Sequence, residues 1–368
     1  GGLNSQISHS RCIISLSIFV AHCLVVDLHT PYIHYIRLLK KGTKMKTSSF
    51  LLLLLLQTAS ASASASSLLP APFSSSLLRK TEGTNWKAWS ASRDEILHLD
   101  KGFQECRWAE YKSQYDPTKT MPVCLHSGTS DIISANIGRR GYWEDCFAVS
   151  RQWHASASNS TYAVNNLNIH VEIGANIGSC IFELLLSAPD AYIVAFEPQS
   201  KNLFRLTQTL KAAPAHLSRR VVVMPIALGA TGGGQTVQLA EVPTDEFGMP
   251  NYGGNYISTD RTNKENNAGT EDVTIEKLDD IIYGTIRSMK MDAQGFECNI
   301  MDGMSLLYPQ RIVTEVEVDS LKRAGCSREG LMQRLSDHSY TSYRYRGSTG
   351  NLIAPPNEGD FSIVAIRQ

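Results

Sequence analysis

The sequence has 368 residues, of which 42% are hydrophobic and 19% charged, and its 35 Lys and Arg are balanced by 35 Asp and Glu. This composition excludes a wholly disordered chain, a collagen and a small disulfide-rich scaffold. Residues 66–368 hold 29 basic and 34 acidic side chains, a formal net charge of −5. Binding to nucleic-acid phosphates requires a basic surface, so we expect no nucleic-acid partner.

The N-terminal region is typical of a secretory signal peptide. Met45 and Lys46 are soon followed by six leucines, Leu51 to Leu56, and then by alternating Ala and Ser through Ala65. We interpret residues 1–65 as an upstream segment and a signal peptide that starts at Met45, and residues 66–80 as a linker. The leucine run is too short for a bilayer, which takes about 20 residues, so we expect no stable membrane span after cleavage.

The signal peptide predicts entry into the secretory pathway, with the ER or Golgi lumen or the extracellular space as the destination. Two alternatives stay open, namely an anchor formed by the apolar residues 13–28 and delivery to a plastid by a signal-peptide route. Asn159 begins a glycosylation sequon in a Ser- and Asn-rich stretch, which is typical of an exposed loop.

Six cysteines follow the predicted signal peptide, at positions 106, 124, 146, 180, 298 and 326. An oxidising compartment permits disulfides, but six cysteines allow 15 pairings, and the sequence does not choose among them. We interpret Cys180 and Cys298 as packed thiols. Because no Cys or His spacing is typical of zinc, we predict no metal site.

Regular alternation of strands and helices begins near residue 166. We predict strands at 167–173, 192–196, 221–226, 236–242, 288–291 and 312–318, a closing strand pair at 340–345 and 361–366, and helices at 179–188, 201–210 and 328–338. This alternation predicts an α/β domain over residues 166–368, with a mostly parallel sheet and helices on both faces. The Gly- and Asn-rich stretch 229–273 predicts a lid or an insertion.

Three predicted strands end in glycines or acids, at the edge where an open parallel sheet binds its ligands. Glu172 and the turn Gly174-Ala175-Asn176-Ile177-Gly178 end the first, Glu197 ends the second, and Asp292 with Glu297 follows a later one. Glycines in such a turn let the backbone approach a ligand, and the next helix offers its N–H groups to negative charge. A carboxylate such as Glu197 can accept two hydrogen bonds from a ribose diol.

The body of the sequence resembles the class I S-adenosylmethionine-dependent methyltransferases, and among them the FkbM-type family. The matching segments are 171–178, 195–198, 225–229, 277–280, 289–297 and 301–303. The most specific is Met289-Lys290-Met291-Asp292-Ala293-Gln294-Gly295-Phe296-Glu297. The resemblance covers about residues 165–320, and it implies a Rossmann-like class I methyltransferase sheet with a closing antiparallel strand and S-adenosylmethionine as cofactor.

The resemblance also implies roles for individual residues. The implied donor-binding residues are Glu172, Gly174, Asn176, Gly178, Glu197, Ala227 and Asp292. Gly174, Asn176 and Gly178 would shape the loop around the methionine part of the donor, and Glu172 would lie near its amino group.

Further along the donor, Glu197 would hold the ribose hydroxyls, Ala227 would lie near the adenine, and Asp292 would face the transferring methyl group. Methyl transfer is an in-line displacement, so a protein contributes positioning and removal of the acceptor proton. Asp292 and Glu297 are therefore the catalytic candidates, which would orient or deprotonate an acceptor hydroxyl.

We expect an O-methyltransferase whose partner is a glycan or a small-molecule acceptor, with the N-terminal extension 81–165 as a cap on the acceptor side. An NAD-dependent oxidoreductase is the enzyme alternative, but the turn is G-x-x-x-G and lacks the G-x-G-x-x-G spacing of dinucleotide-binding proteins. A non-catalytic ligand-binding protein on the same fold is the third interpretation. The oligomeric state is not predicted.

Overall fold

The computed structural model describes residues 78, 86–91, 105–127, 131–157, 168–241, 251–258, 270–346 and 351–368. The chain divides into two units, Gly1–Ala63 and Ser64–Gln368. The predicted signal peptide, the linker apart from Leu78, and the Asn159 sequon lie outside the described residues. No helix in the described ranges is long and apolar enough to cross a membrane.

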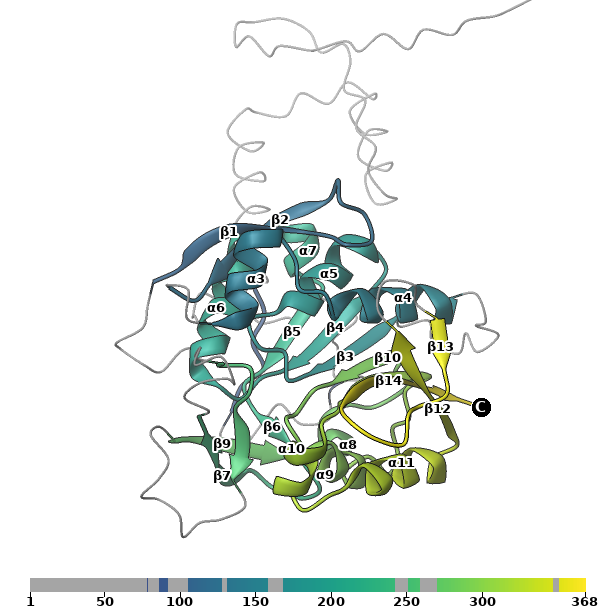
Figure 1. Cartoon of the computed structure of the whole chain (residues 1–368). Coiled ribbons are helices and arrows are strands. Elements are labelled where there is room, and N and C mark those ends of the chain that lie inside the picture. The colour runs from purple at the N-terminus through teal and green to yellow at the C-terminus, as the bar shows by residue number, and fades with distance from the viewer. Residues whose placement is uncertain are drawn as a thin grey trace, which may run out of the picture. The chain divides into compact units, whose positions relative to one another are not determined.

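An eight-stranded sheet forms the centre of the second unit (Figure 1). Its strands are β3 (Ile169–Ile173), β4 (Tyr192–Phe196), β5 (Val221–Met224), β10 (Ser288–Met291), β11 (Arg311–Val316), β12 (Tyr340–Arg346), β13 (Asn351–Ile353) and β14 (Phe361–Arg367). They lie in the order β13-β12-β14-β11-β10-β3-β4-β5. The strands from β5 to β11 run parallel, whereas β14, β12 and β13 are joined by antiparallel pairing. The predicted mostly parallel class I sheet with antiparallel closure is confirmed.

Helices cover both faces of the sheet (Figure 1). On one face lie α4 (Cys146–Ala157), α5 (Ser179–Ser187), α6 (Ser200–Ala212) and α7 (Ala215–Ser218); on the other lie α8 (Leu278–Ile281), α9 (Glu297–Asp302), α10 (Val318–Arg323) and α11 (Arg328–Asp337). Successive strand residues point to opposite faces, so Val194 and Phe196 of β4 join one hydrophobic core and Ile193 and Ala195 join the other.

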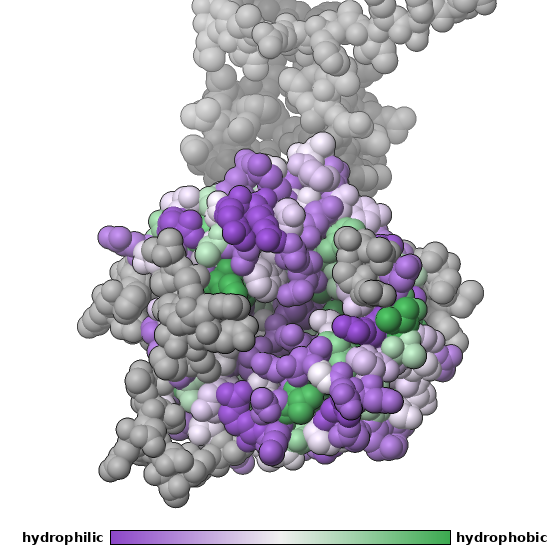
Figure 2. Space-filling view, in the orientation of Figure 1, coloured by the Kyte–Doolittle hydropathy of each residue, from purple (hydrophilic) through white to green (hydrophobic). Residues whose placement is uncertain are grey.

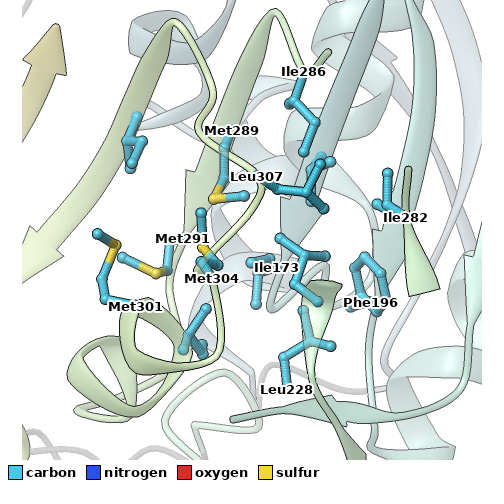
Figure 3. Close-up of a cluster of buried hydrophobic side chains, with 14 of the residues drawn as sticks. Ile173, Phe196, Leu228, Ile282, Ile286, Met289, Met291, Met301, Met304 and Leu307 are labelled. Atoms are coloured by element: carbon cyan, nitrogen blue, oxygen red, sulfur yellow. The ribbon is translucent and has the colours of Figure 1, made fainter. Parts of the chain in front are cut away.

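The core on the α8–α11 face is rich in methionine (Figure 3). Ile173 of β3, Phe196 of β4 and Met289 and Met291 of β10 are at most 3% exposed, and Met304 after α9 is fully buried against them. Burying one apolar side chain of this size stabilises a fold by about 1.5–3 kcal/mol. The strands that carry the candidate residues are thus held by extensive apolar packing.

β3 carries two buried polar residues on its other face. The His170 ring lies 2.7 Å from the Ser288 hydroxyl through Nδ1 and 2.8 Å from the Glu172 carboxylate through Nε2. Both side chains are 1% exposed. Their mutual hydrogen bonds explain why a central parallel strand, which is normally apolar on both faces, tolerates them.

The N-terminal extension shares a core with the sheet domain. It contains the antiparallel pair β1 (Arg107–Lys112) and β2 (Thr120–Leu125) and the helices α3 (Ile132–Arg140) and α4. Trp89 exchanges backbone hydrogen bonds of 2.8 and 2.9 Å with Val223 of β5. Glu183 of α5 accepts hydrogen bonds of 2.8 Å from the Ser113 hydroxyl and the Gln114 N–H, which ties the turn after β1 to the domain.

A second sheet of four strands occupies part of the predicted lid or insertion. Its order is β6 (Ala227–Leu228), β9 (Thr270–Glu276), β7 (Gln235–Ala240) and β8 (Tyr256–Ser258). β7 corresponds to the predicted strand at 236–242. Residues 242–250 and 259–269 lie outside the described residues.

Three disulfides join the six cysteines: Cys106–Cys124, Cys146–Cys180 and Cys298–Cys326. The prediction that Cys180 and Cys298 are packed thiols is therefore wrong. The fold brings the first turns of α4 and α5 together, and it places α9 beside the loop that precedes α11, so each thiol meets a partner that is distant in sequence. Three disulfides are typical of proteins from an oxidising compartment.

In the orientation of Figure 1, the described surface is largely hydrophilic, and hydrophobic residues form small, separate patches (Figure 2).

Candidate active site

A cavity of about 330 Å³ lies at the carboxyl ends of β3, β4 and β10. Small-molecule sites typically enclose about 300–1,000 Å³. We call this space the first cavity. Its lining includes Glu172, Gly174, Asn176, Glu197, Ala227 and Asp292. The structure thus brings together all the predicted donor-binding residues except Gly178.

The turn after β3 depends on two glycines for different reasons. Gly174 and Gly178 have φ angles of 72° and 97°, a backbone region that favours glycine. A Cβ at Gly174 would lie 1.9 Å from the backbone oxygen of Asp292, whereas a Cβ at Gly178 would lie 2.5 Å from Phe182 and 2.6 Å from Leu206. Gly174 therefore lets the turn approach the end of β10, and Gly178 lets it pack against α5 and α6.

Glu197 ends β4 and presents a buried carboxylate to the first cavity. Oε2 accepts the Asn176 N–H at 2.6 Å, and Oε1 accepts the Gln199 N–H at 2.9 Å. Burial, opposed by these two hydrogen bonds, raises the pKa of Glu197 to about 7. Because a carboxylate oxygen can accept more than one hydrogen bond, both oxygens can still accept from a ligand.

Three charged side chains form a row across β3 and β10. Lys290 Nζ lies 3.0 Å from Asp292 Oδ2 and 3.5 Å from Glu172 Oε1. Burial lowers the pKa of Lys290, but the charges of Asp292 and Glu172 outweigh it and leave the pKa above its ordinary value. Asp292 Oδ1 accepts a hydrogen bond of 3.0 Å from the Gln294 amide. Both oxygens of Asp292 are therefore engaged, and a lysine offsets its charge.

Glu297 is the first residue of α9 and is 3% exposed. Its Oε1 accepts the Ala293 N–H at 2.8 Å, and its Oε2 has no partner in the part of the chain that the structure describes. Burial, and to a smaller extent the charge of Asp292, raises the pKa of Glu297 to about 7. Glu297 lines neither cavity described here, so its catalytic role stays a prediction, and its contacts are those of a residue that supports the loop after β10.

The far end of the first cavity is apolar. Its walls include Ala227, Leu239, Ile257 and Phe296. Ile257 belongs to the segment 251–258, whose Tyr252 ring stacks on His126 with 4.5 Å between ring centroids. A ligand with an apolar ring at one end and hydroxyl groups further along would match this arrangement.

A second cavity, of about 440 Å³, adjoins the first. The two share four lining residues, Asp145, Lys290, Asp292 and Glu315. Tyr142 and Phe147 contribute to the second cavity from the N-terminal extension, so the extension forms one of its walls.

Several residues of the site were not predicted from the sequence. Gln199 is 1% exposed and lines the first cavity, and neither atom of its amide has a partner among the described residues. Its position directly after Glu197-Pro198, at the end of a predicted strand, could have indicated that it lies at the site. Glu315 lies near the end of β11, next to the end of β10, but it falls inside the strand predicted at 312–318, so its position in the sequence did not indicate the site. Asp145 precedes α4 and carries no local signal.

No group of three or more His, Cys, Asp or Glu side chains that could hold a metal ion occurs among the residues that the structure describes.

The family model described as the methyltransferase FkbM domain matches residues 172–342. One similar solved structure is a methyltransferase FkbM from Methylobacillus flagellatus KT, with 16% identity and a TM-score of 0.33 over 59% of this chain and 50% of that one. This chain therefore spans half the length of that protein.

Two other similar structures are also methyltransferases. The precorrin-6y C5,15-methyltransferase from Geobacter metallireducens GS-15 has 17% identity and a TM-score of 0.30, covering 59% of this chain and 87% of that one. A SAM-dependent O-methyltransferase from Thermotoga maritima has 9% identity and a TM-score of 0.30, covering 74% and 95%. No curated protein matches the sequence significantly.

Proposed function

The protein carries a methyltransferase FkbM domain at residues 172–342 and is an S-adenosylmethionine-dependent methyltransferase, and from this premise we propose that it methylates a hydroxyl group of a glycan or a small metabolite. The observation that carries the proposal is the first cavity, where residues from the ends of β3, β4 and β10 meet. The family match favours this class over an NAD-dependent oxidoreductase and over a non-catalytic binding protein.

The residues of the first cavity fit S-adenosylmethionine. Gly174 and Asn176 would surround its methionine part, and Glu172 would lie near the amino group. Glu197 would accept hydrogen bonds from the ribose hydroxyls, and Ala227 would lie beside the adenine at the apolar end. The buried Gln199 amide, which lacks a protein partner among the described residues, supports this fit, because an unpaired buried amide is costly.

Bound S-adenosylmethionine would supply an electrophilic methyl group on a sulfonium. The protein would orient the acceptor hydroxyl toward that group, and positioning of this kind supplies much of the catalysis in such a reaction. Asp292 lies on the wall that both cavities share, so its carboxylate, held by Lys290 and Gln294, would orient the hydroxyl. Glu297 would hold the loop after β10 in place by accepting the Ala293 N–H.

Replacement of Asp292 tests this role. We expect Asp292→Asn to lower the transfer of a tritiated methyl group onto accepted hydroxyl compounds about tenfold or more, because the amide loses an acceptor and the ion pair with Lys290. The affinity for S-adenosylhomocysteine, measured by calorimetry, should change less. Asp319→Asn, at an exposed position on α10, is the matched control. Unchanged turnover of Asp292→Asn would contradict the role.

We also propose that the protein enters the secretory pathway, where the N-terminal extension caps the acceptor side. The signal-peptide pattern and the three disulfides support this location. N-terminal sequencing of the mature protein should find a start near Ser66. A start at residue 1 would contradict the proposal, and imaging of the tagged chain would distinguish the lumen from a plastid.

A further inference from the structure

We propose that the second cavity binds the acceptor, an uncharged molecule rich in hydroxyl groups, and that the Glu315 carboxylate accepts the proton of the hydroxyl that becomes methylated. The inference rests on the proposed methyltransferase function, and it assigns a binding site and a catalytic residue that the sequence did not indicate.

The position of the second cavity is the first support. Its volume of about 440 Å³ is in the range of small-molecule sites. It adjoins the first cavity at Asp145, Lys290, Asp292 and Glu315, which line both. An acceptor here would therefore present a hydroxyl to a donor in the first cavity across the wall that includes Asp292.

The surroundings of Glu315 are the second support. Glu315 follows Thr314, which pairs with Met291 in the parallel register of β10 and β11. Glu315 therefore lies beside Asp292 at the carboxyl edge of the sheet. The Asp292 carboxylate is engaged by Lys290 and Gln294, whereas the Glu315 carboxylate has no hydrogen bond or ion pair to another described side chain. Asp145, which also lines both cavities, has a hydrogen bond with Trp143. Glu315 is thus the acid on this shared wall whose carboxylate has no partner among the described side chains.

The charges around Glu315 suit a proton acceptor. Glu315 is an exposed residue of β11; the surrounding protein, and then the negative charges of Asp292, Asp145 and Glu317, raise its pKa above the ordinary value, against an opposing effect of Lys290. A base is most effective when its pKa lies near the working pH.

The proposed step balances. An electron pair of the acceptor oxygen forms the new O–CH₃ bond as the S–CH₃ bond breaks, and the pair of that bond stays on sulfur, which becomes a neutral thioether. The hydroxyl proton moves to Glu315 and then to solvent. The products are a methyl ether, S-adenosylhomocysteine and one proton.

The lining of the second cavity indicates the class of acceptor. Its lining includes the carboxyl groups of Glu144, Asp145, Asp292 and Glu315 and the ammonium of Lys290. Glu144 is also paired with Arg140, so the acids exceed the bases by two. An anionic acceptor would meet this negative field, whereas hydroxyl groups can donate hydrogen bonds to it. The aromatic residues Tyr142, Phe147 and Tyr345 provide surfaces against which the apolar face of a sugar-like ring can pack.

The test uses the full chain, tritiated S-adenosylmethionine, and methyl glycosides of glucose, galactose and mannose beside methyl glycosides of glucuronic and galacturonic acid. We expect a neutral glycoside to be methylated at least about tenfold faster than any uronic acid. We expect Glu315→Gln to lower kcat about 100-fold or more and to remove the rise of kcat with pH that deprotonation of a glutamate with a raised pKa produces. Its affinity for S-adenosylhomocysteine should stay within about threefold of the parent. Glu329→Gln, an exposed acid on α11, is the matched control.

A second variant tests the cavity independently of the base. Of the two cavities, Ser362 lines only the second. Ser362→Trp should therefore abolish glycoside binding, which saturation-transfer NMR of the S-adenosylhomocysteine complex measures. Calorimetry should show that the variant still binds S-adenosylhomocysteine. Glycoside binding that persists in this variant would overturn the cavity assignment, and full kcat in Glu315→Gln would overturn the base.

If the parent binds S-adenosylhomocysteine but methylates none of the neutral glycosides, or prefers a uronic acid or an amine, the acceptor class is wrong. If the parent binds no S-adenosylhomocysteine, the proposed function itself fails.

Discussion

Glu297 holds the loop after β10 by accepting the Ala293 N–H, and its other oxygen is buried without a partner among the described residues. A carboxyl group in such a place is favoured in its neutral form, because burial penalises the charge. Its pKa of about 7 in the folded protein exceeds the ordinary value of 4.5. The folded state therefore binds a proton that the unfolded state has already released at intermediate pH.

This difference predicts how stability depends on pH. The contribution of neutral Glu297 is fully present below pH 4.5 and is lost as the pH rises through about 7. Relative to Glu297→Gln, which does not titrate, the parent should lose up to about 3 kcal/mol of unfolding free energy between pH 4.5 and pH 8. Urea unfolding of both proteins at the two pH values measures this loss. A constant difference between the two proteins would show that Glu297 is already ionised in the fold at low pH.

Candidate site residues could be predicted where an acidic side chain directly follows a predicted strand. Glu197 and Asp292 each follow directly on a short predicted strand, so their type and position indicated the edge of the sheet. Asp145 was not predictable, since it reaches the site only through the packing of α4. Gln199 lies close to Glu197 in the sequence, but no sequence pattern shows that its amide would be buried without a protein partner.

At the scale of elements, the prediction worked best for short apolar strands. β4 and β10 have the predicted bounds. β4 is a compact apolar run, whereas β10 alternates two methionines with Ser288 and Lys290. The helices and closing strands differ from the prediction by a few residues at their ends. The extension was harder, because β1 and β2 form a hairpin with half-exposed, mixed sequences.

The disulfides could not be predicted, because they record which elements meet in space. Cys180 lies among apolar residues in α5, so its local sequence resembles that of a packed thiol, yet α4 crosses α5 there and supplies Cys146. This bond links the extension to the helix that follows the Gly174 turn. It closes a sequence separation of 34 residues, for which chain entropy gives a stabilisation of about 4 kcal/mol.

Removing the α4–α5 bond should therefore destabilise the whole domain. We expect the double variant Cys146→Ala/Cys180→Ala to lose about 2–4 kcal/mol of unfolding free energy, as measured by urea unfolding at pH 7 without a reducing agent. The variant Cys106→Ala/Cys124→Ala, whose bond closes only 18 residues, is the control and should lose less. Equal stability of the α4–α5 variant and the parent would show that this bond does not form in the protein.

At the scale of the whole molecule, the two cavities draw on different parts of the chain. Most lining residues of the first cavity belong to residues 172–342, the range that matches the family. The second cavity also takes Tyr142 and Phe147 from the extension and Ser362 from β14, which lie outside that range. The family match therefore implies the methyl donor, whereas the proposed acceptor site includes segments outside the matched range.

The central claim is that the first cavity is a binding site for S-adenosylmethionine. The most direct measurement is calorimetric titration of the protein and of Glu197→Ala with S-adenosylmethionine, S-adenosylhomocysteine and NAD. We predict micromolar binding of the first two by the parent and a loss of at least about tenfold in the variant, because removing the carboxylate removes charge-assisted hydrogen bonds of about 1.5–3 kcal/mol. Binding of NAD alone, or of none of the three, would contradict the claim.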